Sequence, residues 1–322
     1  MKPAIGKRLK NSTLNNKCEL NRIFCYNVSM LIMIVGPTGS GKTSIALTLA
    51  KEYSAPIING DAFQIYQEMD IGTAKVERDS EDYKKHYLLD IVKPNQTYSV
   101  KEYQNDFRKT YLELKKKYPT IIVCGGTGLY IRAALYDYVF EDEEEADVSD
   151  LEELSNEELY EMLKKVDIKA TETIHMNNRK RVIRALQIAR THATNKSENI
   201  DKQEHALFFK DEDVRFYFIN PNREQLYENI NTRVDQMFEM GLLDEVKDLL
   251  KKYDLSLTAK AAIGYKEVLD YLDNKYSLEE CKELIKKRTR NYAKRQVTFF
   301  KHQLPCEEFQ TKEELLKEAM KH

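Results

Sequence analysis

The sequence lacks the cysteine spacings of disulfide-rich and zinc-binding proteins. Its five cysteines in 322 residues include no CxxC pair, which excludes the common zinc and disulfide frameworks and favours a reducing compartment. Runs of about 18 apolar residues, the length of a membrane span, are also missing. We therefore expect a cytoplasmic protein with no membrane partner.

An excess of one charge sign is missing as well. The 51 Lys and Arg and the 53 Asp and Glu leave a formal net charge of −2. The molecule is not a polycation, so a nucleic-acid partner would need a local basic face. The length predicts two domains, or one domain with a large insertion. We expect a monomer.

The N-terminal segment differs from the rest of the chain. Residues 1–30 hold six Lys and Arg against one acid, Glu19, with no apolar core of a secretory signal. A transit peptide is conceivable. We expect a disordered basic extension instead, with the folded protein beginning near Met30 or Met33.

Apolar runs that alternate with helical segments predict an α/β fold, a parallel sheet covered by helices on both faces. The predicted strands are 31–35, 56–59, 87–91, 120–124 and 214–219. The predicted helices are 42–53, 100–117, 156–165, 178–190, 222–252, 264–272 and 277–301. Because residues 141–153 carry nine acids, and no strand signal follows before 214, we predict an α/β core at 31–140 and 206–322, interrupted by an all-helical insertion at 141–205.

A complete phosphate-loop motif stands between the first strand and the first helix. Gly36-Pro-Thr-Gly-Ser-Gly-Lys-Thr43 fits G-x-x-x-x-G-K-[ST] in its confirming context. Glycines let backbone amides turn toward phosphate oxygens, and the helix N-terminus adds positive potential. The expected diphosphate-binding residues are Gly36, Thr38, Gly39, Ser40, Gly41, Lys42 and Thr43, with the Thr43 hydroxyl as a ligand of Mg²⁺.

The motif alone leaves the phosphate compound open, with ATP or GTP as the default. An NTPase normally ends a later strand with an Asp for the metal, whereas strand 120–124 ends in Cys124 and Asp90 is only a weak substitute. The missing acid argues against an ordinary NTPase.

Two further segments follow strand ends, which face the ligand crevice of an open parallel sheet. Asp61 follows strand 56–59, where a carboxylate can bind metal or accept a proton, or cap a helix. Spacing alone favours neither. Gly125-Gly-Thr127-Gly128 permits close approach of a substrate, but these residues alone favour a mere tight turn.

Six segments together resemble the tRNA dimethylallyltransferase family. They are Gly36–Thr43, Asp61–Lys75, Tyr87–Ile91, Gly125–Tyr130, Ile263–Glu267 and Thr289–Phe299. Order and spacing agree from about residue 31 to 303, and the Asp61–Lys75 block is far more specific than the phosphate loop.

The resemblance implies a P-loop NTPase-like core and a prenyl transfer to RNA. The donor would be dimethylallyl diphosphate and the acceptor N6 of adenosine 37 in the tRNA anticodon loop, with pyrophosphate as the leaving group. Asp61 would act as general base on a flipped-out adenine, and Lys42, Thr43 and Mg²⁺ would neutralise the leaving group. Thr127 would face the substrate.

The resemblance also implies binding residues. Arg233 is expected to contact the diphosphate, since Asn229 stands where family members often carry an Arg. The expected tRNA contacts are Asp61, Ala62, Phe63, Gln64, Lys180, Arg181, Arg184, Gly264, Tyr265, Lys266, Lys294, Arg295 and Gln296. The last residues belong to 282–301, which has eight Lys and Arg against one acid, and the others include an acid-free cluster at 179–190. Such clusters supply phosphate contacts.

Two other functions remain alternatives at this point. A nucleotide or nucleoside kinase shares the strand, phosphate loop and helix, but would need ATP turnover. A non-enzymatic RNA-binding protein with a decayed phosphate loop is the other, and the intact Lys42-Thr43 pair argues against it.

Overall fold

The computed structural model describes residues 30–136, 147–191, 207–209 and 212–321. The predicted extension at 1–29 and much of the acidic segment, 141–146, lie outside these ranges. Contacts divide the chain into two compact units, Met1–Ala134 with Phe209–His322, and Leu135–Phe208. The described helices include none that is both long and apolar enough to cross a membrane.

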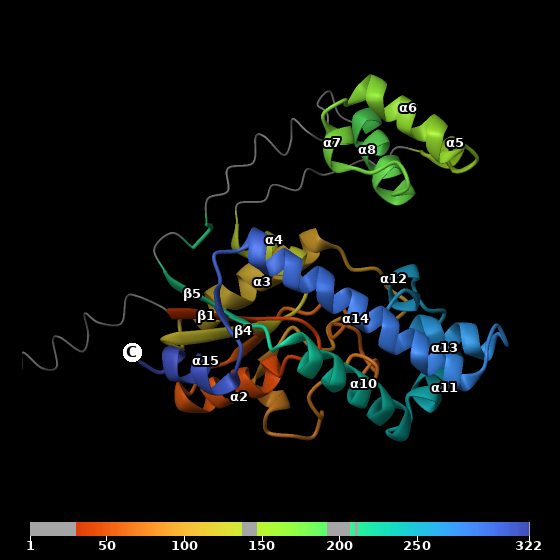
Figure 1. Ribbon diagram of the computed structural model, residues 1–322. Coiled ribbons are helices and arrows are strands. Elements are labelled where there is room, and N and C mark those ends of the chain that lie inside the picture. The colour runs from red at the N-terminus through yellow and green to blue at the C-terminus, as the bar shows by residue number, and fades with distance from the viewer. Residues whose placement is uncertain (1–29, 137–146, 192–206, 210–211, 322) are drawn as a thin grey trace, which may run out of the picture. The chain divides into compact units, whose positions relative to one another are not determined.

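A parallel sheet forms the centre of the first unit (Figure 1). Its strands lie in the order β3-β2-β4-β1-β5-β6. Their bounds are β1 Met30–Val35, β2 Ile57–Asn59, β3 His86–Tyr87, β4 Thr120–Gly125, β5 Asp213–Ile219 and β6 Glu307–Phe309. All five pairings are parallel. The first strand is therefore central, and its carboxyl end carries the phosphate loop between the ends of β4 and β5.

Helices cover both faces of this sheet, because its strands are apolar on both sides. Helices α2 (Lys42–Glu52) and α15 (Lys312–Ala319) pack on one face. On the other lie α3 (Val100–Leu114), α4 (Gly128–Leu135) and α14 (Leu278–Gln303) (Figure 1). The predicted fold class, a P-loop NTPase-like α/β core, is confirmed for this unit.

A second apolar cluster of the same unit lies beyond the strand ends. It joins α10 (Arg223–Glu239), α11 (Leu242–Lys252), α12 (Leu257–Lys260) and α13 (Tyr265–Leu272) to the segment after β2. That segment, residues 60–85, is called the β2–β3 loop below and ends in the short 3₁₀ helix η2 (Tyr83–Lys85). Its buried Ile65, Tyr66 and Met69 anchor it to these helices.

Two local predictions are wrong, and three short elements were missed. The strand expected at 87–91 is only His86–Tyr87, because Leu88 and Asp90 take positive φ angles of 61° and 53° and leave extended conformation. The helix expected at 222–252 breaks at Gly241, with φ of 99°. Periodicity did not reveal α4, β6 or α15, which are short.

The second unit contains only helices among its named elements. They are α5 (Ser149–Glu152), α6 (Asn156–Val166), α7 (Ala170–Thr173) and α8 (Arg179–Thr191). Leu159 and Leu163 of α6 pack with Val182 and Leu186 of α8 in a small core of their own. Such a core is what lets a helical insertion fold as a unit.

Candidate active site

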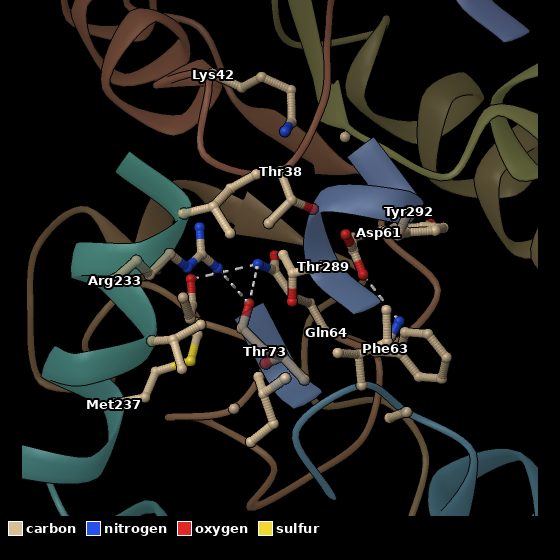
Figure 2. A pocket seen from close by; sticks show the side chains of 18 of the residues that line it. Thr38, Lys42, Asp61, Phe63, Gln64, Thr73, Arg233, Met237, Thr289 and Tyr292 are labelled. Carbon is tan, nitrogen blue, oxygen red and sulfur yellow. Dashed lines mark hydrogen bonds between the residues drawn. The ribbon is translucent and has the colours of Figure 1, made fainter. Parts of the chain in front are cut away.

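A cavity of about 300 Å³ opens where the phosphate loop, the β2–β3 loop, α10 and α14 meet. Polar groups from Lys42, Asp61 and Arg233 enter it from different elements, and Met237 and Phe63 lie at the end opposite Lys42 (Figure 2). The apolar part of the wall consists of Phe63, Ala74, Ile230, Val234, Met237, Ala262, Ile263 and Ile285. The cavity therefore has a polar end at the phosphate loop and an apolar end away from it.

Local geometry explains the motif spacing of the phosphate loop. Gly39 and Gly41 have φ angles of 85° and 84°, in the left-handed region that glycine tolerates. At Gly36 a Cβ atom would lie 2.5 Å from the carbonyl oxygen of Ile219, so β5 approaches the loop closely. The Ser40 hydroxyl is buried, and no partner for it lies in the described part of the chain.

Lys42 reaches into the polar end, and no carboxylate among the described residues lies at hydrogen-bond distance from it. Its Nζ donates to the carbonyl of Pro37 at 2.8 Å. Burial lowers the pKa of its ammonium group to about 8, opposed by the nearby Cys124 and Asp61 and aided by the charge of Arg233. A buried ammonium group whose charged form is destabilised in this way is suited to binding an anionic ligand.

Arg233 of α10 supplies a second cation at the same end. Its Nη2 donates to the Thr73 carbonyl at 3.4 Å, and its buried Nε finds no partner among the described residues. Burial lowers the pKa of the guanidinium, and Asp61 opposes that shift. One turn earlier, Asn229 donates to the Gly39 carbonyl at 3.0 Å. In this chain Asn229 supports the phosphate loop while Arg233 faces the cavity.

Asp61 presents one carboxylate oxygen to the cavity. Its Oδ1 accepts from the Phe63 amide at 2.9 Å (Figure 2), and no described residue donates to Oδ2. No helix follows, since residues 61–75 form turns, so the helix-cap reading is wrong and the carboxylate closes an Asx-turn instead. One oxygen fixes the side chain, which leaves the other available to a ligand.

Residues behind Asp61 hold its position. Asn59 is buried; its Oδ1 accepts from the Asp61 amide at 3.0 Å and its Nδ2 donates to the Asp61 carbonyl at 3.0 Å. The Thr127 hydroxyl accepts from the Ala62 amide at 3.0 Å. Thr127 is not part of the described cavity wall, so the structure gives it a positioning contact where we expected a catalytic one. Asn59 was missed, because a lone Asn at a strand end carries no signal.

Of the residues considered as metal ligands, Asp90 and Cys124 do not fit that role and Thr43 does. Asp90 is bound to Lys75, Arg78 and Tyr83, which excludes it as a free metal ligand. Burial raises the pKa of the Cys124 thiol to about 11, so it stays protonated at neutral pH. The described residues contain no cluster of three or more metal-binding side chains. Thr43 lines the cavity and fits a Mg²⁺ ion that takes its other ligands from phosphate and water, as Mg²⁺ commonly does.

Several predicted tRNA contacts are buried in the first unit. Tyr265 is 0 % exposed and donates to Glu245. Gln296 accepts from the Thr38 amide at 2.9 Å and donates to the Gly126 carbonyl at 2.9 Å. Gly264 is buried too, and its amide donates to Glu267. These three residues hold loops together, so their prediction as RNA contacts is corrected. Both ends of the Gln296 amide are occupied.

The other predicted contacts keep accessible groups. Lys266, Lys294 and Arg295 are exposed. Phe63 and Gln64 line the cavity, with the Gln64 amide nitrogen donating to the Thr73 carbonyl at 3.0 Å. The remaining basic residues of α14 are more restricted than the sequence implied. Arg288 pairs with the buried Glu267, and Arg290 donates to Asn231 at 2.6 Å.

The basic cluster on α8 of the second unit also contains both residues that are bound within the unit and residues that are exposed. Arg179 donates to the carbonyls of Leu151 and Leu154, and Arg190 binds both carboxylate oxygens of Asp150 at 2.7 Å. Lys180, Arg181 and Arg184 are exposed, with Arg184 donating to Gln187 at 2.7 Å. Arg190 is exposed as well, but its charge is paired with Asp150. The other three exposed basic residues are those that we predicted as RNA contacts.

Comparison with known proteins decides the family. The IPP transferase family model matches residues 64–303. The tRNA dimethylallyltransferase of Anoxybacillus flavithermus is 41 % identical over 281 residues, 87 % of this chain and 89 % of the relative. The chain belongs to the IPP transferase family. The family predicted from the motifs is thus confirmed, as is an enzyme of the prenyltransferase class.

Other family members agree in sequence and in fold. The Bacillus cereus tRNA dimethylallyltransferase is 43 % identical over 84 % of this chain and 87 % of its own. The crystal structure of a tRNA isopentenylpyrophosphate transferase from Staphylococcus epidermidis has a TM-score of 0.65 and 36 % identity, covering 90 % of this chain and 97 % of its own. A eukaryotic dimethylallyltransferase, described as acting on tRNA, has a TM-score of 0.72 and 28 % identity, covering 84 % and 70 %.

Proposed function

We propose that this IPP transferase moves the dimethylallyl group of dimethylallyl diphosphate to N6 of adenosine 37 in the tRNA anticodon loop. The observation that carries the proposal is the composition of one cavity. Two cations and the phosphate loop stand at one end, an apolar wall at the other, and the Asp61 carboxylate between them. A diphosphate with a short hydrocarbon chain matches those two ends.

The donor site follows from the charges. Lys42 and Arg233, both desolvated and short of partners, would bind the diphosphate oxygens, since charge-assisted hydrogen bonds are strongest where water is excluded. The dimethylallyl group would lie on the apolar wall. When bound at Thr43 with the diphosphate, Mg²⁺ would supply further positive charge for the leaving group.

The transfer step assigns a role to Asp61. N6 of the adenine attacks C1 of the donor, the N6–C1 bond forms, and the C1–O bond breaks with its electron pair leaving on pyrophosphate. The N6 proton passes to Oδ2 of Asp61, the oxygen that no described residue binds, while the Phe63 amide keeps Oδ1 in place. The adenine must leave its stack to reach this position.

Transfer of label tests the proposal. The protein is incubated with unmodified tRNA, Mg²⁺ and either dimethylallyl diphosphate labelled in the prenyl group or ATP labelled in the γ-phosphate. We expect prenyl label in the RNA, lost when adenosine 37 is replaced by guanosine. Appearance of the phosphate label in RNA or in a nucleoside, without prenyl transfer, would favour the kinase reading and overturn the proposal.

A further inference from the structure

A carboxylate outside the cavity wall binds three consecutive amides of the β2–β3 loop. Glu245 of α11 accepts from the amides of Asp70 at 2.9 Å and Ile71 at 2.7 Å through Oε2, and from Gly72 at 3.2 Å through Oε1. The Tyr265 hydroxyl donates to the same Oε1 at 2.6 Å. Consecutive amides that converge in this way form an anion-binding nest.

Tyr265 brings a third segment to the same point. Its ring packs so closely on Gly72 that a Cβ atom there would lie 2.4 Å from Cε2 of the ring. The β2–β3 loop is thus held by side chains from α11 and α13, some 170 to 190 residues later in the chain. Within the loop, the amides of Ala74 and Lys75 donate to the carbonyls of Ile71 and Asp70 at 3.0 Å. The amides of residues 70–72 themselves are bound by the distant Glu245.

The nest is connected to the donor site through the next residue. Gly72, Thr73 and Ala74 line the cavity. The Thr73 carbonyl accepts from Arg233 Nη2 at 3.4 Å and from Gln64 Nε2 at 3.0 Å (Figure 2). Among the described residues this contact is the one hydrogen bond that Arg233 makes, so the direction of the guanidinium depends on where the loop places that carbonyl.

We propose that Glu245 is a positioning residue for the donor site. Its anion fixes residues 70–72, the fixed loop sets the Thr73 carbonyl, and that carbonyl aims Arg233 at the diphosphate. The inference rests on the proposed function for the identity of the donor. A neutral Gln at 245 would present one carbonyl oxygen and an NH₂ group to amides that all donate, so it could not reproduce the nest.

A double-mutant cycle tests the connection. Glu245→Gln, Arg233→Ala and the double variant are compared for kcat and for the KM of dimethylallyl diphosphate and of tRNA. If Glu245 acts through Arg233, the donor KM rises about tenfold in each single variant and hardly further in the double, because the two residues share one effect. The KM of tRNA should stay within about twofold. Additive effects on the donor KM would overturn the proposal.

A matched control separates positioning from general destabilisation. Glu68 also binds a tyrosine hydroxyl, that of Tyr253 at 2.7 Å, and pairs with Lys252, but it touches none of the amides of residues 70–72. Glu68→Gln should leave the donor KM unchanged. If Glu68→Gln raised the donor KM as much as Glu245→Gln does, neutralising any hydrogen-bonded carboxylate nearby would have this effect. That result would refute a specific role for Glu245.

A binding measurement keeps the inference apart from the proposed function. Calorimetry with inorganic pyrophosphate and Mg²⁺ needs no prenyl transfer. We expect weaker pyrophosphate binding in Glu245→Gln, and a smaller loss in Tyr265→Phe, which removes one donor to the carboxylate and serves if Glu245→Gln fails to fold. Unchanged pyrophosphate affinity in both variants would overturn the inference, whereas absence of transfer by the wild type would overturn only the function.

Discussion

The phosphate loop and the β2–β3 loop both line the cavity, and Lys42 of the first and Lys75 of the second stand in different settings. Lys42 donates to a backbone carbonyl and bears the cost of burial. The Lys75 side chain is 1 % exposed and donates to Asp70 at 2.8 Å and Asp90 at 2.5 Å. A lysine between carboxylates has its charge compensated inside the protein. A lysine without carboxylate partners can pair its charge with a bound ligand instead. We therefore expect Lys75 to stabilise the fold and Lys42 to bind the ligand.

The largest effect that we expect concerns the carboxylate between the two loops. Asp61→Asn keeps the hydrogen bond from Phe63 but not the basicity, so kcat should fall by about 10²–10⁴. Affinity for tRNA should change little, since phosphate contacts dominate it. Single-turnover rates measure the chemical step. A rate near that of wild type would mean that Asp61 only closes its turn.

The two lysines should respond in opposite ways to replacement by methionine. For Lys42→Met we expect donor affinity to fall by about 10²-fold, as for the loss of a buried charge-assisted contact. Stability below pH 8 should not decrease, because the folded protein no longer keeps a desolvated ammonium group charged. Donor titration and urea unfolding measure the two quantities. A large loss of stability would place Lys42 in the same class as Lys75.

Lys75→Met should chiefly destabilise the protein. It removes the buried cation that Asp70 and Asp90 share and leaves them with Arg78, which is partly exposed. Breaking a buried pair costs about 3–5 kcal/mol, and here we expect about 2–4 kcal/mol, since Arg78 remains and Asp70 is partly exposed. At 10 °C, where the variant stays folded, the donor affinity of the folded fraction should match wild type. Urea unfolding would refute the assignment if the two variants showed equal midpoints.

The pH dependence of donor binding sharpens the contrast further. The pKa of Lys42 is lowered to about 8 in the free protein, and a bound diphosphate would raise it. Binding should therefore take up a proton above pH 8, and affinity should fall by up to tenfold per pH unit through that range. Calorimetry in buffers of different ionisation enthalpy counts the protons. Lys42→Met should abolish the uptake, and uptake that persisted there would exclude Lys42 as its source.

The smallest effect concerns exposed lysines. Neutralising Lys266 and Lys294 together should weaken tRNA binding a few-fold and reduce the slope of log affinity against log salt by about 1–2, because fewer counterions are released. Arg288→Ala is the comparison, since its charge is paired with Glu267. It should lower the unfolding midpoint while the salt slope stays nearly constant. The reverse result would assign RNA binding to Arg288.

Local patterns were sufficient for the central strands of the sheet, the phosphate loop and the family. Continuous apolar runs identify β1 and β4 because a strand of a parallel sheet is buried on both faces. The motif Gly36–Thr43 predicts its own geometry, since the left-handed glycines and the helix start lie within eight residues. The Asp61–Lys75 block and the blocks near 263 and 289 supplied the family, which the comparisons confirm.

The sequence by itself therefore determined most of the longer elements, the phosphate-binding motif and the family of this protein, because each depends on residues close together in the chain. Only the tertiary structure decided which charges are free. Arg288 and Arg290 looked equivalent to Lys294, yet their partners Glu267 and Asn231 lie 21 and 59 residues away. The same holds for Glu245, whose ligands come from two distant segments. Pairing between residues far apart in the chain depends on how the elements pack, so local sequence periodicity cannot predict it.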